Sequence, residues 1–364
     1  MPQNHAARRD RAATALAALG ADAALVTSPV NVRYLTGLVS SNAAVLLARD
    51  GRAVLGTDSR YAGTAERECP DVELVIDRDV DGALTRLAGQ AGWRAIAFED
   101  RSLTVQRFGR IAKEGAGDGL IPAGDVLDEL RMVKDETELG LLARASAITA
   151  EAFSAVLGEL RPGVTEGAYA IALERAMTDL GAEAVAFDTI VASGPNGAVP
   201  HHHPGDRAFE AGDLVTVDCG ARVGGYHADM TRTVAIGKPA AWQCEIYQLV
   251  AQAQAAGTAA ARPGADTADV DAAARDLIEA AGHGGHFTHG LGHGVGLEIH
   301  EAPIISCGRA GRLADRVPIT IEPGIYLPGR GGVRIEDTLV VRAGTGAAGL
   351  AQPLTTITRE LLVL

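Results

Sequence analysis

The 364-residue sequence has few cysteines, little basic charge and no long apolar run. Its four cysteines are scattered and lack the paired spacing of a disulfide framework, so we expect reduced thiols in a cytoplasmic protein. A formal net charge of −13 argues against nucleic-acid or anionic-membrane partners, since these bind basic surfaces. No stretch reaches the apolar length that spans a bilayer, so we expect no membrane partner.

The chain is long enough for two domains. In residues 1–125, helical and strand patterns alternate, which indicates an α/β layer. The expected elements there are a helix at 12–19 and strands at 23–27, 43–48, 53–56 and 95–98. In residues 131–364, helices group with antiparallel hairpins, which indicates an α+β domain. The expected helices are 136–157, which Asp135 would cap, 166–180, 242–257 and 270–281.

Two pairs of carboxylates stand in similar segments: Asp218 with Asp229, and Glu322 with Glu336. The string VTVDCG around the first acid aligns with ITIEPG around the third, and DMT aligns with EDT, so the sequence predicts a duplicated hairpin. A turn near Val223-Gly224 would set Asp218 opposite Asp229, roughly 5 Å away, where like charges repel. A single strand acid is commonly just solvated, but four acids among strong strand formers favour a bound cation.

Histidine is a further ligand type in this sequence. Nine of the ten histidines fall between His201 and His300. His289 and His293 have the spacing of a helical zinc pair, but the four glycines between 290 and 296 would each cost about 1 kcal/mol in a helix. We therefore expect an extended or loop-like segment. A site rich in carboxylate oxygens suits hard or borderline ions such as Mn²⁺.

The strings GHGVG with LEIHE, IEPGIY and GVRIEDT resemble the proline-specific pita-bread metallopeptidases, the family of aminopeptidase P and prolidase. The amino-terminal strings NVRYLTG and TDSRY resemble the creatinase-like domain that precedes the catalytic domain in that family. The resemblance implies a creatinase-like α/β domain over residues 1–125 and an α+β pita-bread catalytic domain over residues 131–364.

The resemblance also implies a site. It places the five ligands of a dinuclear metal centre, with Mn²⁺ favoured and Co²⁺ or Zn²⁺ as alternatives, at Asp218, Asp229, His293, Glu322 and Glu336. Two such ions about 3.5–4 Å apart can share a bridging hydroxide that attacks an amide. Glu322 is our candidate for shuttling the proton of that water.

The same resemblance places two substrate-contacting histidines at His201 and His300, with His289 nearby and Arg334 behind Glu336. His201 could instead be an exposed loop histidine, because it begins a run of three. A proline after the scissile bond leaves a tertiary amide with no N–H, which suits an apolar wall. Tyr326 could form that wall or belong to the core.

The expected reaction is hydrolysis of the Xaa-Pro bond in peptides with proline at the second position, by a homodimeric enzyme. Xaa-Pro aminopeptidase is favoured over Xaa-Pro dipeptidase. A dipeptidase must hold the proline carboxylate, which Arg330 could do, although a solvated loop arginine is the commoner case. A non-peptidase hydrolase or a binding scaffold on this fold is a more remote alternative, and retention of all five ligand types argues against both.

Overall fold

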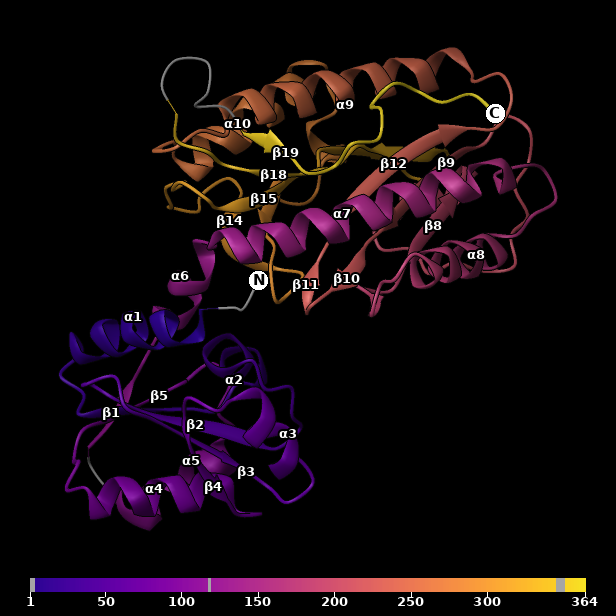
Figure 1. Ribbon diagram of the computed structural model, residues 1–364. Coiled ribbons are helices and arrows are strands. Elements are labelled where there is room, and N and C mark those ends of the chain that lie inside the picture. The colour runs from indigo at the N-terminus through magenta and orange to yellow at the C-terminus, as the bar shows by residue number, and fades with distance from the viewer. Residues whose placement is uncertain (1–3, 117–118, 345–350) are drawn as a thin grey trace. The chain divides into compact units, whose positions relative to one another are not determined.

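The computed structural model describes residues 4–116, 119–344 and 351–364 (Figure 1). The chain divides into two compact units, Met1–Arg131 and Met132–Leu364. No sheet and no apolar core cluster is shared between the units among the described residues: the first unit has a six-stranded sheet, and the second has several smaller sheets and two cores.

The first unit is built on a six-stranded sheet in the order β4-β3-β2-β1-β5-β6. Its strands are β1 (Ala23–Val26), β2 (Ala43–Ala48), β3 (Ala53–Thr57), β4 (Glu73–Ile76), β5 (Ile96–Phe98) and β6 (Leu120–Pro122). Its helices are α1 (His5–Ala17), α2 (Pro29–Thr36), α3 (Ala62–Glu68), α4 (Val80–Gln90), α5 (Val105–Ile111), the π-helical η1 (Ala112–Ala116) and α6 (Val126–Met132). The four predicted strands are present within one residue at each end, and the predicted helix overlaps α1, which begins seven residues earlier than expected, so the α/β prediction is confirmed.

The second unit contains two helix pairs and two elaborate hairpins. The first half comprises α7 (Glu136–Val156), η3 (Leu157–Glu159), α8 (Glu166–Asp179), β7 (Ala184–Val185), β8 (Ile190–Ser193), η4 (Gly194–Ala198), β9 (Leu214–Cys219), β10 (Ala221–Val223), β11 (Tyr226–His227) and β12 (Met230–Ala235). The second half comprises α9 (Ala241–Ala260), α10 (Thr267–Ala280), η5 (Gly284–His286), β13 (Gly292–Gly294), β14 (Glu301–Ile305), β15 (Pro318–Ile321), β16 (Gly324–Leu327), β17 (Gly331–Arg334), β18 (Asp337–Val340) and β19 (Gln352–Pro353).

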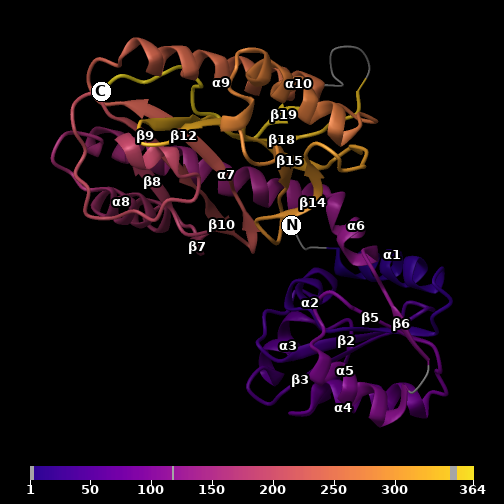
Figure 2. The ribbon, with the colours of Figure 1, turned by 180° about the vertical axis from the view of Figure 1, so that it is seen from behind.

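The strands of this unit lie between the two helix pairs, with α7 and α8 on one side and α9 and α10 on the other (Figures 1 and 2). One apolar core, which includes Phe153 and Val217, joins α7 and α8 to the first hairpin. A second core, which includes Val250 and Ile319, joins α9 and α10 to the second hairpin. The strands therefore form the middle layer, and the acids that they carry lie inside the unit.

Helix α7 begins where the sequence predicts. The side chain of Asp135 accepts from the backbone N–H of Glu138 at 2.9 Å, while the side chain of Glu138 accepts from the N–H of Asp135 at 2.8 Å, which completes a capping box. Contrary to the sequence-based expectation, the stretch Glu136–Glu159 is long and apolar enough to cross a membrane. More than half of its most apolar 18-residue window is buried within the protein, as in the core helix of a globular domain.

The duplicated hairpin is present in both halves, but its first register differs from the prediction. Asp218 pairs with Thr231, and not with Asp229. The reason is the turn, which lies at Gly224-Gly225, because both glycines adopt positive φ values (58° and 84°) that a tight two-residue turn requires. A shift of two residues keeps both acids on the same side of the ladder.

In the second hairpin the two acids face each other. Ile321 pairs with Asp337 and Gly324 pairs with Arg334, so the same register on either side sets Glu322 opposite Glu336. The two hairpins are also joined to each other. The backbone N–H of Glu336 donates to the carbonyl of Thr231. This junction brings the two acid pairs to one place.

Candidate metal centre

The five predicted ligands line one cavity of about 480 Å³ in the second unit. They come from different strands or strand ends: Asp218 in β9, Asp229 before β12, His293 in β13, Glu322 after β15 and Glu336 before β18. Because each ligand lies in a strand or directly beside one, the strand ladders bring the five side chains together. The structure therefore brings all five together.

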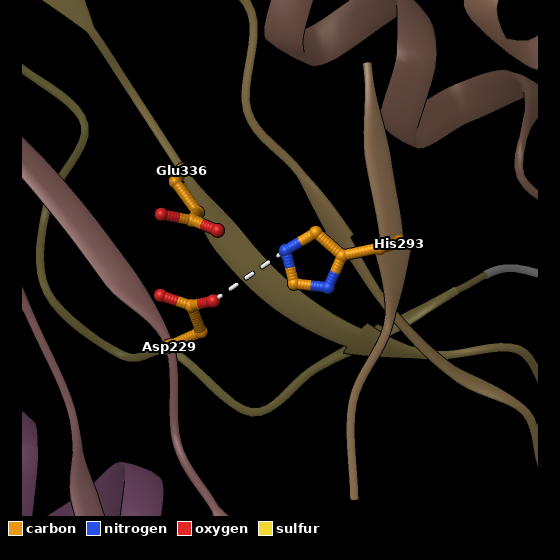
Figure 3. A group of neighbouring side chains, drawn as sticks. All are labelled: Asp229, His293 and Glu336. Atoms are coloured by element: carbon orange, nitrogen blue, oxygen red, sulfur yellow. Dashed lines mark ion pairs between the residues drawn. The ribbon is translucent and has the colours of Figure 1, made fainter. Parts of the chain in front are cut away.

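Three of the five form the tightest group. Asp229, His293 and Glu336 each offer a ligand atom, and these atoms all lie within 4.8 Å of one another (Figure 3). In Figure 3 both carboxylates point toward the imidazole. Nε2 of His293 lies 3.7 Å from Asp229 Oδ2 and 3.3 Å from Glu322 Oε1. Such a mixture of buried carboxylates and one imidazole suits a divalent cation.

The tautomer of His293 is set by its other ring nitrogen. Nδ1 lies 3.0 Å from the carbonyl oxygen of Gly294, so in the neutral ring it carries the proton and donates it there. That leaves the lone pair of Nε2 facing the acids, as a metal ligand requires. Glu322 is one of the acids beside Nε2. Although burial favours the neutral ring, the hydrogen bond and charge of Glu322 raise the pKa of His293.

Asp218 carries the most direct sign of a missing partner. Its Oδ2 accepts from Arg334 at 2.7 Å. Its Oδ1 is buried and has no hydrogen-bond partner among the described residues. A buried carboxylate oxygen left unsatisfied is costly, and a cation in the cavity would satisfy it. The residues present therefore fit a bound metal.

The acids also repel one another. Burial first, and then the charges of neighbouring carboxylates, raise the pKa of Asp229 and Glu336 well above their usual range. Burial likewise raises the pKa of Asp218, against the opposing charge of Arg334. Glu322 differs: burial opposes its ionisation, but His293 outweighs this and its pKa falls to about 2. Divalent cations would relieve the repulsion among these four acids.

We expect added metal to stabilise the protein more at pH 8 than at pH 6. Raised carboxyl pKa values mean that the metal-free native state binds protons more tightly than the unfolded chain, so its stability falls as pH rises through those values. Metal needs the same groups deprotonated, so its affinity rises with pH. Saturating Mn²⁺ should raise Tm by on the order of 5 °C or more at pH 8. Differential scanning fluorimetry with Mn²⁺ or EDTA tests this, and an equal gain at both pH values would contradict it.

Arg334 lines the cavity and is linked to Glu336 through one other side chain. Its guanidinium contacts Asp218 and the hydroxyl of Tyr326, at 2.7 and 3.0 Å, and not Glu336. The side chain is almost fully buried. Nε of Arg334 donates to the hydroxyl of Thr231 at 3.1 Å, and that hydroxyl donates to Oε2 of Glu336 at 2.7 Å. Arg334 thus stands behind Glu336, with Thr231 between them, while its direct ion pair is with Asp218.

Tyr326 does not line the cavity, so of the alternatives that the sequence left open it is the core residue and not the apolar wall. The residue is 5% exposed, and its hydroxyl lies 2.8 Å from Nε2 of His289 and 3.0 Å from Arg334. His289 does line the cavity. A hydrogen-bonded chain thus runs from Asp218 through Arg334 and Tyr326 to His289, and it fixes the orientation of His289.

His201 and His300 both line the cavity. The ring of His300 packs edge-on against His293, with centroids 4.4 Å apart. The next residue, Glu301, is buried and accepts from Nζ of Lys134 at 2.7 Å, which anchors the start of β14. His201 is exposed at the cavity, so its loop position does not remove it from the site.

Arg330 does not line the cavity. It lies in the exposed turn between β16 and β17, where its guanidinium stacks over the ring of Trp242 at 4.3 Å from the ring centroid. The proposed contact with a substrate carboxylate has no support in this geometry. Arg330 is a surface arginine, the alternative that the sequence left open.

Comparison with known proteins identifies the family. The profile of the creatinase/prolidase N-terminal domain matches residues 8–133, and that of metallopeptidase family M24 matches residues 140–343. The chain belongs to metallopeptidase family M24. An Xaa-Pro dipeptidase of Pyrococcus furiosus is 36% identical to this M24 chain over 349 residues, which cover 94% of the chain and 95% of that protein.

Solved structures agree with this assignment. An Xaa-Pro dipeptidase from Bacillus anthracis has a TM-score of 0.94 at 34% identity, covering 99% of this chain and 100% of that one. An X-Pro aminopeptidase from Thermotoga maritima has a TM-score of 0.89 at 35% identity, covering 98% and 99%. The predicted resemblance is confirmed, and with it the α+β pita-bread fold preceded by a creatinase-like domain.

Several residues of this M24 site were not predicted from the sequence. Thr231 was aligned with Thr338 as part of the repeat, but nothing in the string indicates that its hydroxyl holds Glu336. Phe187, Ile299 and Ile304 add apolar surface to the cavity, and none of them was singled out in the sequence, although Ile299 lies within the string LEIHE. Their convergence is a product of the fold.

Proposed function

We propose that the protein is a metal-dependent Xaa-Pro dipeptidase, which hydrolyses the bond between an amino acid and a following proline. The carrying observation is the convergence of Asp218, Asp229, His293, Glu322 and Glu336 in the cavity of an M24 peptidase. Relatives that extend over nearly the whole chain, and that are named Xaa-Pro dipeptidases, favour this specificity over the aminopeptidase expected from the sequence.

In this proposal the five residues hold two divalent ions, with Mn²⁺ favoured because oxygen ligands predominate. Such ions, when bound, supply Lewis acidity that activates water and polarises the scissile carbonyl. Glu322 lines the cavity beside His293, so its carboxylate can accept the proton of the attacking water. His201 and His300 hold the substrate carbonyl and favour the charge that develops on it.

The apolar side of the cavity supports a preference for proline. Phe187, Ile299 and Ile304 line it beside the histidines. A proline ring is apolar, and its amide nitrogen has no hydrogen to be satisfied. Proline can therefore lie against an apolar wall without burying an unpaired N–H group, whereas any other residue at that position would bury one.

Xaa-Pro aminopeptidase is the second candidate, and one observation favours it. Among the described residues, Arg334 is the only arginine or lysine that lines the cavity, and it is committed to Asp218 and Tyr326. A dipeptide carboxylate would then depend on histidines such as His201, while a longer peptide presents no carboxylate there. The structurally similar X-Pro aminopeptidase agrees with this candidate.

Paired substrates distinguish the two candidates. We expect Gly-Pro to be hydrolysed with a kcat/KM at least about 10-fold above that of Gly-Pro-Ala, because a pocket that takes the free carboxylate has no room for a chain beyond it. Release of glycine is followed by chromatography, with Mn²⁺ and with EDTA. The reverse preference would establish the aminopeptidase, and no metal-dependent hydrolysis of either would refute both.

A further inference from the structure

The loop that carries His201 is held by one buried carboxylate that lies outside the group of five. This loop, residues 193–205, runs from the end of β8 through η4 and across the cavity. The carboxylate belongs to Glu166, the first residue of α8, and it is fully buried. Nothing in the proposed reaction uses Glu166.

Both oxygens of Glu166 accept hydrogen bonds from this loop. Oε1 accepts from the backbone N–H and the hydroxyl of Ser193, at 2.8 and 2.6 Å, and from the side-chain amide of Asn196 at 3.0 Å. Oε2 lies 2.8 Å from Nε2 of His202 and 3.3 Å from the backbone nitrogen of Gly205. One side chain thus fixes the start, the middle and the end of the loop.

The position of Glu166 keeps it charged. Burial alone would raise its pKa, but the hydrogen bonds from Ser193 and Asn196 outweigh burial and lower it. The first turn of α8 also favours a negative charge, because the helix dipole places its positive end there. An ionised carboxylate offers only acceptors, which matches a set of partners that can all donate.

His202 connects this anchor to the site. Its ring lines the cavity and hydrogen-bonds to Glu166, while His201 and His203 on either side also line the cavity. His201 is exposed, and no hydrogen bond of its own ring is found among the described residues. The placement of His201 therefore follows from how its neighbour is held.

We propose that Glu166 is a positioning residue for hydrolysis, which acts through His202 to hold His201 against the substrate. This inference rests on the proposed peptidase function and adds a residue to it. Glu166 itself touches neither the substrate nor the five ligands. Its removal should therefore impair substrate binding while leaving metal binding intact.

Two substitutions at His202 separate anchoring from ring chemistry. Glutamine places an amide N–H where Nε2 of histidine lies, so His202→Gln keeps the donor to Glu166, while His202→Leu removes it at similar size. We expect His202→Leu to raise KM for Gly-Pro at least about 10-fold, and His202→Gln to stay within about fivefold of the wild type. Glu166→Gln replaces one accepting carboxylate oxygen by an NH2 group that would face the donor groups of the loop. This variant should therefore behave like His202→Leu.

Two further readouts complete the test. The Mn²⁺ dissociation constant from calorimetry should stay within about threefold in all three variants, since none alters a ligand. Hydrogen exchange across residues 193–205 should accelerate in Glu166→Gln and His202→Leu but not in His202→Gln. Equal KM for the two His202 variants, or weakened Mn²⁺ binding in Glu166→Gln, would overturn the inference. If the wild type cleaves neither substrate, the proposed function fails, and the exchange pattern alone decides whether Glu166 anchors the loop.

Discussion

Asp229→Asn is expected to lower kcat/KM for Gly-Pro by on the order of 1,000-fold or more, because the metal ions that activate the attacking water would lose one of their ligands. The same substitution should stabilise the metal-free protein. Asp229 is buried among like charges that raise its pKa, so a neutral side chain of the same shape removes repulsion. In excess Mn²⁺ the wild type should be more stable than Asp229→Asn, since it binds the metal more tightly and is stabilised more by it.

This reversal distinguishes a ligand from a structural acid. Tm is measured by scanning calorimetry at pH 8 in EDTA and in Mn²⁺, beside kcat/KM. Asp276→Asn, the same change on the exposed face of α10, is the matched control and should alter neither quantity appreciably. If Asp229→Asn destabilises the metal-free protein and retains activity, Asp229 is a structural acid and the metal-centre assignment is wrong.

Arg334→Met is expected to destabilise the protein by about 3–5 kcal/mol, the cost of leaving a buried charge without its partner. Arg334 is the cation that faces Asp218 and also fixes Tyr326, so its loss exposes Asp218 to the other acids with no compensation. Guanidinium unfolding of the metal-free protein measures the change in the free energy of unfolding. It is done at pH 8, where Asp218, left without Arg334, is least able to lose its charge by protonation. Activity should fall as well, because Asp218 would no longer be oriented.

Arg330→Met is the matched control. The two arginines stand four residues apart in the same hairpin, but Arg330 is exposed and stacks on Trp242. Its replacement should cost less than about 1 kcal/mol and leave kcat/KM for Gly-Pro close to wild type. Comparable losses in both variants would mean that the hairpin as a whole, and not the contact between Arg334 and Asp218, determines the effect.

The sequence predicted the elements of this site well because its signals are local. A two-residue period with an acid at the same place in each copy identifies both hairpins, and glycine-rich spacing around His293 excludes a helix. The same is true of α7, whose capping box needs only Asp135 and Glu138. Short, weakly periodic elements such as β4 and α3 were missed, since packing on the first unit's sheet decides them.

The contacts that position the site were not predictable in the same way. The register of the first hairpin depends on which two of several glycines form the turn, and Gly224-Gly225 displaced the expected pairing by two residues. The resemblance placed Arg334 behind Glu336, to which Thr231 links it, but nothing in the sequence indicated its direct contact with Asp218, 116 residues earlier. Glu166 meets its partners across 27 to 39 residues of chain, with no local signature.

The central claim, that Asp218, Asp229, His293, Glu322 and Glu336 form a two-metal hydrolytic centre, is tested most directly by titrating metal-free protein with Mn²⁺ while Gly-Pro hydrolysis is followed in the same samples. Free Mn²⁺ is read from its paramagnetic resonance signal. The account predicts two ions bound per chain, with hydrolysis appearing as they bind and disappearing again in EDTA. Undiminished hydrolysis by the metal-free protein, or two bound ions whose number is unchanged in Asp229→Asn, would contradict it.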